Sequence, residues 1–248
     1  GWLRTNRNWV INDEGNIIIL RGANFMGYEF GAWSSHTEED YRRMASWGFN
    51  VVRLPIAWHY IEPQPSIYSK SYFTNYVDRD IAWAEKYGIY IILDMHQWYW
   101  SPRFTFGGKN GSGFPAWAYY AYPDTGEGYL QAVTDFWNGK GPNGTSPSAL
   151  NPSMQERLLI AWKFVAERYA NQSVIMGFDL LNEPVRGYID AFTFDTYTLP
   201  AFMEKIVDNV KSVDSRHILI WEPRTGYGGS QPPSRPNVVS SPHIYGPV

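Results

Sequence analysis

Short apolar runs alternate along this chain with longer segments whose apolar residues recur at helical spacing, and this alternation constrains the fold most. Strand-like runs lie at residues 51–56, 90–95, 174–181, 218–221 and 238–243. Helix-like segments occupy residues 37–48, 77–88, 158–169 and 202–213. Strands that alternate with helices are typical of a parallel sheet, because each helix returns the chain to the start of the next strand. With the run that ends at Asn24, the sequence predicts six such strands.

The run at residues 174–181 illustrates what such a strand delivers at its end. It lacks polar alternation, as strands covered on both faces do. It is followed by Asn182, Glu183 and Pro184, and proline stops the strand because it cannot donate a hydrogen bond to the ladder. In parallel α/β folds, active sites are built at the carboxyl edge of the sheet. Glu183 is therefore a candidate proton donor.

Two segments depart from the alternation. Residues 9–11 and 16–20 flank turn-forming residues and predict an N-terminal hairpin. Residues 97–151 form a long connection rich in Gly, Pro, Trp and Tyr, which is typical of a functional loop or lid, and a short helix is expected at 129–137. No stretch has the composition of a linker, so residues 1–248 are predicted to form a single domain.

The composition excludes several classes of function. A net charge of −3 gives no sign of a nucleic-acid partner. No apolar run approaches the length of a membrane span, so an integral membrane protein is not expected. The absence of cysteine excludes disulfides, thiolate metal sites and cysteine nucleophiles. Neither a His-x-x-His pattern nor an Asp-rich loop is present, so no metal or other cofactor is expected, and His36 and His59 are predicted to be surface or rim residues.

Aromatic residues make up 17% of the chain, with 12 Trp and 18 Tyr. Most are expected in the core, but a surplus also suits a sugar-binding cleft, because the flat C–H face of a pyranose packs on an indole or phenol ring. Trp98 is the first candidate for such a wall, since it directly follows Gln97 at a predicted strand end. Core packing and a role as subsite wall both remain open for Trp58, Trp100 and Trp117.

Polar residues follow each of the six predicted strands. They are Asn24; Arg53; Asp94, His96 and Gln97; Asn182 and Glu183; Glu222; and His243 and Tyr245. A single one has a structural explanation, such as a buried ion pair for Arg53 or a satisfied core histidine for His96. Polar residues at all six ends, gathered at one edge of the sheet, indicate an active site.

Five short motifs stand in a particular order along the chain. They are Arg-Gly-Ala-Asn at 21–24, Asn-Val-Val-Arg-Leu-Pro at 50–55, Asp-Met-His-Gln at 94–97, Leu-Asn-Glu-Pro at 181–184 and His-Ile-Tyr at 243–245. Together they resemble glycoside hydrolase family 5, whose members are cellulase-like, retaining (β/α)8-barrel glycosidases. Gly-Phe-Pro-Ala-Trp-Ala at 113–118 and Asp-Phe-Trp at 135–137 are similar to the endoglycoceramidase-like branch. The resemblance implies a (β/α)8 TIM barrel that follows the N-terminal hairpin.

For the residues that match these motifs, the resemblance implies specific roles. Glu183 would be the general acid/base, which protonates the leaving oxygen while a second carboxylate, about 5–5.5 Å away, attacks the anomeric carbon. The negative charge of that carboxylate would raise the pKa of Glu183. Asn182 would bind the sugar 2-hydroxyl, and Arg53 would lie beneath the nucleophile and keep it ionised.

The other implied roles concern substrate binding. His96 and His243 would hold sugar hydroxyls, Gln97 and Trp98 would contribute to the same site, and Tyr245 would donate a hydrogen bond to the nucleophile. The function expected from the resemblance is that of a retaining endo-β-glycosidase, which hydrolyses a β-glucan or related β-linked oligosaccharide by double displacement. We expect the enzyme to be secreted or extracellular. Endoglycoceramidase-like cleavage of glycolipids is the first alternative, and a carbohydrate-binding protein without catalysis is the second.

The sequence departs from the family at its last strands. The family places its nucleophile, a glutamate, at the end of strand seven, whereas only six strands are predicted before Val248. We expect the last two βα units, and the nucleophile with them, to come from a C-terminal segment outside these residues. The alternatives are a shortened fold with Glu222 as nucleophile, and a six-stranded protein that only binds sugar.

Overall fold

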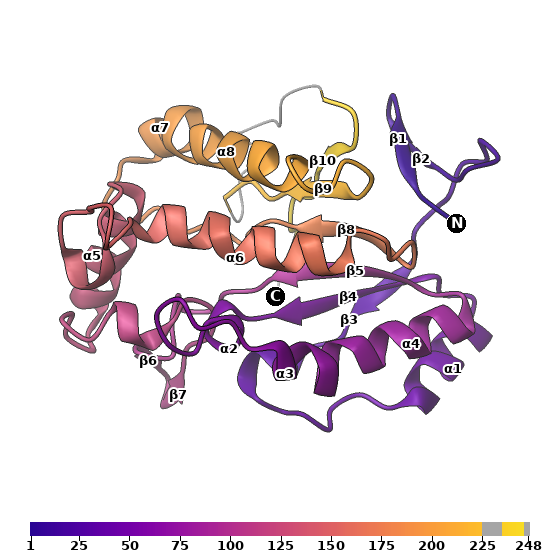
Figure 1. Ribbon diagram of the computed structural model, residues 1–248, viewed down its shortest axis with the longest axis horizontal. Coiled ribbons are helices and arrows are strands. Elements are labelled where there is room, and N and C mark those ends of the chain that lie inside the picture. The colour runs from indigo at the N-terminus through magenta and orange to yellow at the C-terminus, as the bar shows by residue number, and fades with distance from the viewer. Residues whose placement is uncertain (225–234, 246–248) are drawn as a thin grey trace.

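Six parallel strands form the centre of the protein in the computed structural model, which describes residues 1–224 and 235–245 (Figure 1). The order across the sheet is β10-β9-β8-β5-β4-β3, so consecutive strands of the barrel pattern are neighbours in the sheet. The strands are β3 (Gly22–Asn24), β4 (Val51–Ile56), β5 (Tyr90–Met95), β8 (Ile175–Asp179), β9 (Ile218–Trp221) and β10 (Val238–Ser240). This arrangement confirms the predicted α/β class and the prediction of six strands.

Long helices connect these strands where the apolar spacing predicted them. They are α1 (Glu38–Ser46), α4 (Asp78–Tyr87), α6 (Met154–Tyr169) and α8 (Leu199–Lys211). Thr37 and Asp40 form a capping box at the start of α1, and Gly88, with a φ of 67°, ends α4. Helix α1 packs beside α4, and α6 packs beside α8, along one side of the sheet (Figure 1).

The insertion at residues 97–151 lies at the carboxyl ends of the strands, towards which the arrows in Figure 1 point. It contains α5 (Gly126–Trp137), a hairpin of β6 (Thr105–Phe106) and β7 (Lys109–Asn110), and 3-10 turns at Ala116–Ala118 and Pro142–Gly144. The expected short helix is therefore present as α5. The remaining short helical segments are Tyr28–Phe30, α2 (Trp58–Ile61), α3 (Lys70–Tyr72), Phe73–Val77, α7 (Ala191–Thr193) and Phe194–Thr198.

The N-terminal hairpin exists, but one strand earlier than predicted. It pairs β1 (Arg4–Asn6) with β2 (Trp9–Ile11) in an antiparallel ladder. The expected second arm at residues 16–20 is not a strand; only Ile17 forms a bridge, with Ile11. The side chain of Asn12 accepts hydrogen bonds from the next turn as its composition suggested, but the chain then leaves towards β3 instead of pairing further.

Two apolar clusters lie on opposite faces of the sheet. The larger lies between the sheet and its helices and includes fully buried Leu54, Leu93 and Phe178. The smaller lies on the inner face, where Val51, Met176, Ile218 and Ile220 meet Leu3 beside the hairpin. The inner face is thus apolar at the amino ends of the strands, which leaves its polar residues at the carboxyl ends.

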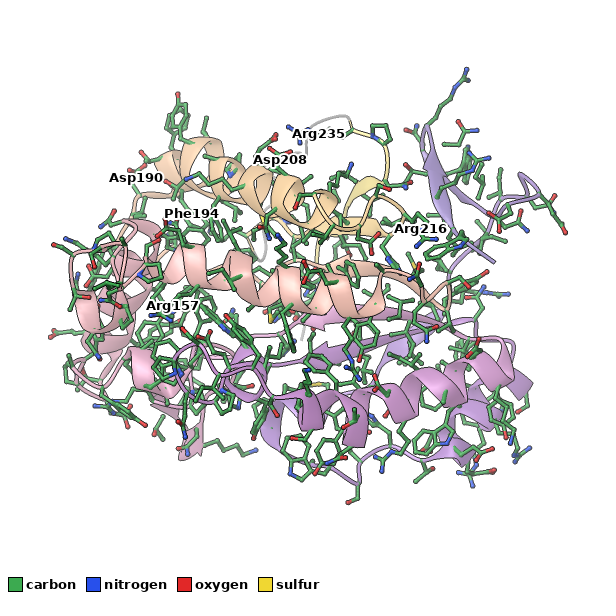
Figure 2. The ribbon with its side chains drawn as sticks, viewed as in Figure 1. Arg157, Asp190, Phe194, Asp208, Arg216 and Arg235 are labelled. Atoms are coloured by element: carbon green, nitrogen blue, oxygen red, sulfur yellow. The ribbon has the colours of Figure 1, made fainter. Side chains whose placement is uncertain are left out.

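Side-chain contacts fix the last described segment, residues 235–245, against the rest of the protein. The Arg235 guanidinium lies 2.5 Å from the carboxylates of both Glu204 and Asp208 in α8. Arg235 and Asp208 are labelled in Figure 2. Asn237 bonds to the backbone and side chain of Thr5 in the hairpin. These contacts hold β10 beside β9, and so carry His243 towards the other strand ends. In the described part of the chain, no helix has the length and apolar character needed to cross a membrane.

Candidate active site

The carboxyl ends of the strands surround a cavity of about 170 Å³. It is lined by Asn24, Met26, Arg53, Pro55, His96, Trp98, Asn182, Glu183, His243 and Tyr245. Every residue predicted for the site except Gln97 lines it. Gln97 lies behind the wall, where its Nε2 donates to the backbone oxygens of Asn182 (3.1 Å) and Glu183 (3.0 Å). The structure therefore brings the predicted residues together and places Gln97 as a support of the strand end.

Glu183 stands at the wall of this cavity on an unusual backbone. It follows β8 and has a φ of 42°, in the left-handed region that residues other than glycine rarely adopt. Its Oε1 accepts from His243 Nδ1 at 2.8 Å and from the hydroxyl of Tyr245. The hydrogen bond from His243 lowers the pKa of Glu183, with a further contribution from Tyr245, although burial acts to raise it. The expected raised pKa is thus wrong for this arrangement, because a cation and not an anion is the neighbour.

His243 and Tyr245 approach from β10 and depart from one implied role. The hydrogen bonds to Glu183 and then Glu222 raise the pKa of His243 to about 10, so the imidazole is charged at neutral pH. Tyr245 was expected to donate to the nucleophile, but its hydroxyl donates to Glu183. No other carboxylate among the described residues lines the cavity, so this hydroxyl turns to the acid/base candidate.

Arg53 in β4 is the centre of a buried charge cluster beneath the cavity. Its Nε lies 2.9 Å from Asp179, its Nη1 2.9 Å from Asp94 and its Nη2 2.7 Å from Glu222. Burial acts to lower the pKa of Arg53, but the three carboxylates raise it above its ordinary value. The same Nη2 donates to Asn182 Oδ1 at 3.0 Å. One guanidinium therefore ties together the ends of four strands.

Asp179 is a member of this cluster that the sequence analysis did not single out. Burial raises its pKa well above the ordinary value, and the negative charge of Glu222 adds to the effect while Arg53 opposes it. Burial and Glu222 thus favour the neutral form of Asp179, and Arg53 favours the charged form. It lies within the apolar run 174–181. A single carboxylate in a strand that is otherwise apolar is the feature by which the sequence could have identified it as a site residue.

The remaining predicted residues have their side chains partly engaged. Asn182 is 4% exposed and donates from Nδ2 to the backbone oxygen of Gln97 at 2.9 Å. His96 is 8% exposed, and its Nδ1 lies 2.7 Å from Asp94; burial acts to lower the pKa of His96, but Asp94 raises it overall. These contacts orient both side chains, while each still lines the cavity.

A metal ion is not needed to explain the buried carboxylates. Among the described residues, Asp179, Glu222 and His243 have potential ligand atoms within 4.8 Å of one another. The guanidinium of Arg53, however, contacts both carboxylates of that group. The positive charge that a cation would supply is already provided by a side chain.

A second hollow of about 330 Å³ adjoins the first. It is lined by Gln97, Trp98, Tyr99, Glu183, Pro184, Val185, Arg186 and Arg224. Trp98 and Glu183 line both hollows, so they form the wall between them. Glu183 thus stands where the two hollows meet.

Several other predictions are decided by burial. Trp58 and Trp100 are 1% and 0% exposed and belong to the core, so the packing interpretation is correct for both. His36 was predicted to be a surface or rim residue, but it is 5% exposed and its Nδ1 lies 3.1 Å from Asp80. The prediction was wrong because Asp80, which is also buried, contacts the ring of His36 and offsets the free-energy cost of its desolvation. His59 is half-buried, and burial lowers its pKa to about 4.

Comparison with known proteins identifies one family and several relatives. The family model described as Cellulase (glycosyl hydrolase family 5) matches residues 11–248. Curated relatives include endoglycoceramidase I of Rhodococcus hoagii (strain 103S), 26% identical over 98% of this chain, and glucan 1,3-beta-glucosidase 1 of Schizosaccharomyces pombe (strain 972), 27% identical over 99% of it. Endo-glycoceramidase II from Rhodococcus sp. has been solved as a ganglioside GM3 complex and as a lactosyl-enzyme intermediate; these match 96% of this chain with TM-scores of 0.81 and 0.82 at 28% and 27% identity.

The chain is shorter than these relatives. It covers 52% of the endoglycoceramidase, 56% of the glucosidase and 59% of the solved endo-glycoceramidase chain. It thus spans little more than half the length of the proteins to which it is similar.

Proposed function

Because the chain belongs to glycosyl hydrolase family 5, we propose that it carries the acid/base half of a retaining β-glycosidase, with Glu183 as the acid/base. The supporting observation is the position of its carboxyl group. Among the described residues, Glu183 is the only carboxylate that lines the cavity formed by the strand ends. It also separates this cavity from the adjoining hollow, as a proton donor to a bond between them must.

The reaction proceeds in two displacements. First, Glu183 gives its proton to the glycosidic oxygen as that oxygen leaves, and a second carboxylate bonds to the anomeric carbon. Then Glu183 takes a proton from water, whose oxygen bonds to the anomeric carbon while the carboxylate leaves, so the configuration is retained. Asn182 and His96 line the same cavity and offer donors to sugar hydroxyls. The lactosyl-enzyme intermediate described for endo-glycoceramidase II is consistent with this route.

The second carboxylate is proposed to come from polypeptide outside the described residues. Glu222, the alternative nucleophile, is fully buried and does not line the cavity. In the described sheet, β3 and β10 each have one edge without a neighbouring strand, and a barrel closes only when such edges pair. We therefore propose that two further βα units complete the sheet.

The intact mass of the natural protein tests this: a mass well above 28.6 kDa, or a tightly bound second polypeptide, supports it. Robust turnover by a single 28.6 kDa chain contradicts it.

The incoming carboxylate also accounts for the protonation that the reaction requires. In the described residues, His243 lowers the pKa of Glu183, which favours the base form. A carboxylate about 5–5.5 Å away would act in the opposite direction and favour the acid form. Its charge is lost when the glycosyl-enzyme forms, and the influence of His243 then prevails. The incoming carboxylate thus favours the acid form of Glu183 in the first displacement, and His243 favours the base form in the second.

Three measurements on the natural protein test the role of Glu183. Proton NMR of the first product formed from an aryl β-lactoside is expected to show the β-anomer. Glu183→Gln is expected to lower kcat/KM for an unactivated alkyl lactoside by about 10²- to 10⁴-fold. Glu183→Ala with azide is expected to yield the β-glycosyl azide, because azide needs no general base. Sugar binding that persists in a wild-type protein with no turnover would instead indicate the non-catalytic alternative.

The adjoining hollow favours a glycolipid over a glucan as substrate. Cleavage of a glycolipid between sugar and lipid requires an apolar groove on the leaving-group side of Glu183. Half of the residues that line the adjoining hollow are apolar or aromatic, namely Trp98, Tyr99, Pro184 and Val185; the others are polar, namely Gln97, Glu183, Arg186 and Arg224. The apolar half suits the lipid part of a leaving group. The ganglioside GM3 complex of endo-glycoceramidase II supports the same substrate class. We therefore propose a β-linked glycolipid, cleaved between sugar and lipid.

A direct competition tests this choice. The natural protein is expected to cleave lactosylceramide in detergent micelles with a kcat/KM at least about tenfold above that for cellotetraose, consistent with the loss expected when an apolar contact is missing. Val185→Asn is expected to lower kcat/KM for the glycolipid and to leave an aryl lactoside almost unaffected. Val213→Asn, at a half-buried position two residues beyond the end of α8, serves as control. Preference for cellotetraose in the wild type contradicts the proposal.

A further inference from the structure

Glu222 makes contacts on both sides of Glu183 without reaching the cavity. It follows β9, is fully buried and does not line the space in which a sugar would bind. Its Oε2 accepts from the backbone N–H of Glu183 at 2.6 Å. Its Oε1 lies 2.7 Å from Arg53 Nη2 and 3.1 Å from His243 Nε2.

These contacts close a ring around the acid/base candidate. The other ring nitrogen of His243, Nδ1, lies 2.8 Å from Glu183 Oε1. The ring therefore runs from the Glu183 amide to Glu222, on to His243, and back to the Glu183 carboxyl group. A carboxylate at position 222 thus holds both ends of the same residue, its main chain directly and its side chain through the histidine.

The backbone of Glu183 is the place where such a restraint matters. Its φ of 42° lies in a region that a residue with a side chain adopts only when the surroundings impose it. Released from that conformation, the residue would carry its carboxyl group away from the wall between the two hollows. The bond from Glu183 N to Glu222 acts on the amide of the strained residue itself.

We infer that Glu222 is a positioning residue for the acid/base, fixing the left-handed backbone of Glu183 and the orientation of His243. The inference rests on the proposed function of Glu183. A carboxylate suits this place, because three donors face it: the Glu183 amide, the Arg53 guanidinium and the His243 ring. Arg53 balances its charge, and burial together with the negative charge of Glu222 raises the pKa of the neighbouring Asp179.

A comparison of leaving groups separates this role from a merely structural one. A 2,4-dinitrophenyl group departs without protonation, whereas an alkyl group needs the acid. In the natural protein, Glu222→Gln keeps the size of the side chain but turns an amide N–H₂ towards a donor. We expect its kcat/KM to fall about 10²-fold for an alkyl β-lactoside, the loss that a displacement of about 1 Å can cause. For the dinitrophenyl lactoside we expect a loss of less than about tenfold, because its leaving group does not need the displaced acid.

Three further variants complete the experiment. Glu222→Asp keeps the charge beside Arg53 but withdraws the carboxylate, so it is expected to fold and to show the same selective loss, to a smaller extent. Asp214→Asn changes a buried carboxylate that bonds to His217 outside the site and is expected to affect both substrates equally. Glu183→Gln provides the benchmark for loss of the acid.

Each result has one meaning. Selective loss in both Glu222 variants supports the inference, as does selective loss in Glu222→Asp if Glu222→Gln does not fold. Equal losses for the two substrates, or no loss in either variant, overturn it. If Glu183→Gln is selective and the Glu222 variants are not, only this inference fails. If Glu183→Gln itself shows no selectivity, the proposed function fails, and the inference with it.

Discussion

The protonation of Glu183 depends on side chains that lie far from it in the sequence. His243 is 60 residues away, yet its hydrogen bond is the largest influence that lowers the pKa of Glu183. The same contact, together with the one to Glu222, raises the pKa of His243 to about 10. The pair is therefore an ion pair at neutral pH. A cation at this place stabilises the form of Glu183 that accepts a proton, so the form that donates one must be stabilised by another group.

Replacement of His243 tests this balance. His243→Asn removes the cation, so the pKa of Glu183 is expected to rise, and the acid form then persists to higher pH. In the natural protein the alkaline limb of the pH profile of kcat/KM should move to higher pH. Tyr245→Phe removes the smaller of the two hydrogen-bonding influences and should move it less, in the same direction. A limb that moves to lower pH in His243→Asn would contradict the assignment.

At the scale of elements, local sequence signals were sufficient to predict the helix ends and insufficient to predict the strands of the hairpin. Thr37 with Asp40, and Gly88, act through groups within one helical turn, so the sequence alone predicts where α1 begins and α4 ends. Strand β1 (Arg4–Asn6) has no apolar residue, and it pairs with β2 across a two-residue turn. Because its residues show no apolar periodicity, the sequence pattern did not predict it.

The same distinction applies to the site. The strand ends could be predicted because each is the last residue of a recognisable run. The contacts between them could not be predicted, because three of the partners of Arg53 lie 126, 129 and 169 residues further along the chain. Asp179 was missed because its neighbours in sequence are apolar, and only the folded sheet brings it to Arg53.

The first turn of α6 offers a test of a capping interaction whose partners all lie within one helix end. Ser153 Oγ accepts from the Glu156 amide at 3.2 Å, and Glu156 accepts from the Ser153 amide at 2.8 Å. Ser153→Ala is expected to lower the free energy of unfolding by about 1 kcal/mol, the usual contribution of an N-cap. Ser46→Ala, at the exposed end of α1, is the control and should stay within about 0.5 kcal/mol. Urea titrations measure both, and equal effects would contradict the prediction.

A second test concerns the contact between α6 and the strand end that carries the site. Trp162 is fully buried, and its Nε1 donates to the backbone oxygen of Leu180 at 2.9 Å. Trp162→Phe leaves that carbonyl without its partner, and the free energy of unfolding is expected to fall by about 1–3 kcal/mol. Trp47→Phe, at a position that is 68% exposed, should change it little. A negligible effect of Trp162→Phe would mean that another group or water takes over the carbonyl.

The whole molecule, as described, is an open sheet with two unpaired edges. Strand β3 is exposed along its length, and a hollow of about 490 Å³ lies beside it, bounded by α1. Met26 and Trp47, which line this hollow, are 53% and 68% exposed. Large apolar side chains and unpaired strand groups in one place favour association with another polypeptide. The proposed barrel completion would cover this surface, and in its absence another chain can.

This gives a prediction for a polypeptide made of residues 1–248 alone. We expect it to self-associate as its concentration rises, because the exposed edge of β3 can pair with a strand of another copy. Ala23→Lys places a charge in the middle of that edge and should shift the equilibrium towards monomer. Ala149→Lys adds the same charge in an exposed loop and should leave association unchanged. Sedimentation velocity measures all three, and a wild-type polypeptide that stays monomeric at all concentrations would show that the edge is protected by means other than pairing.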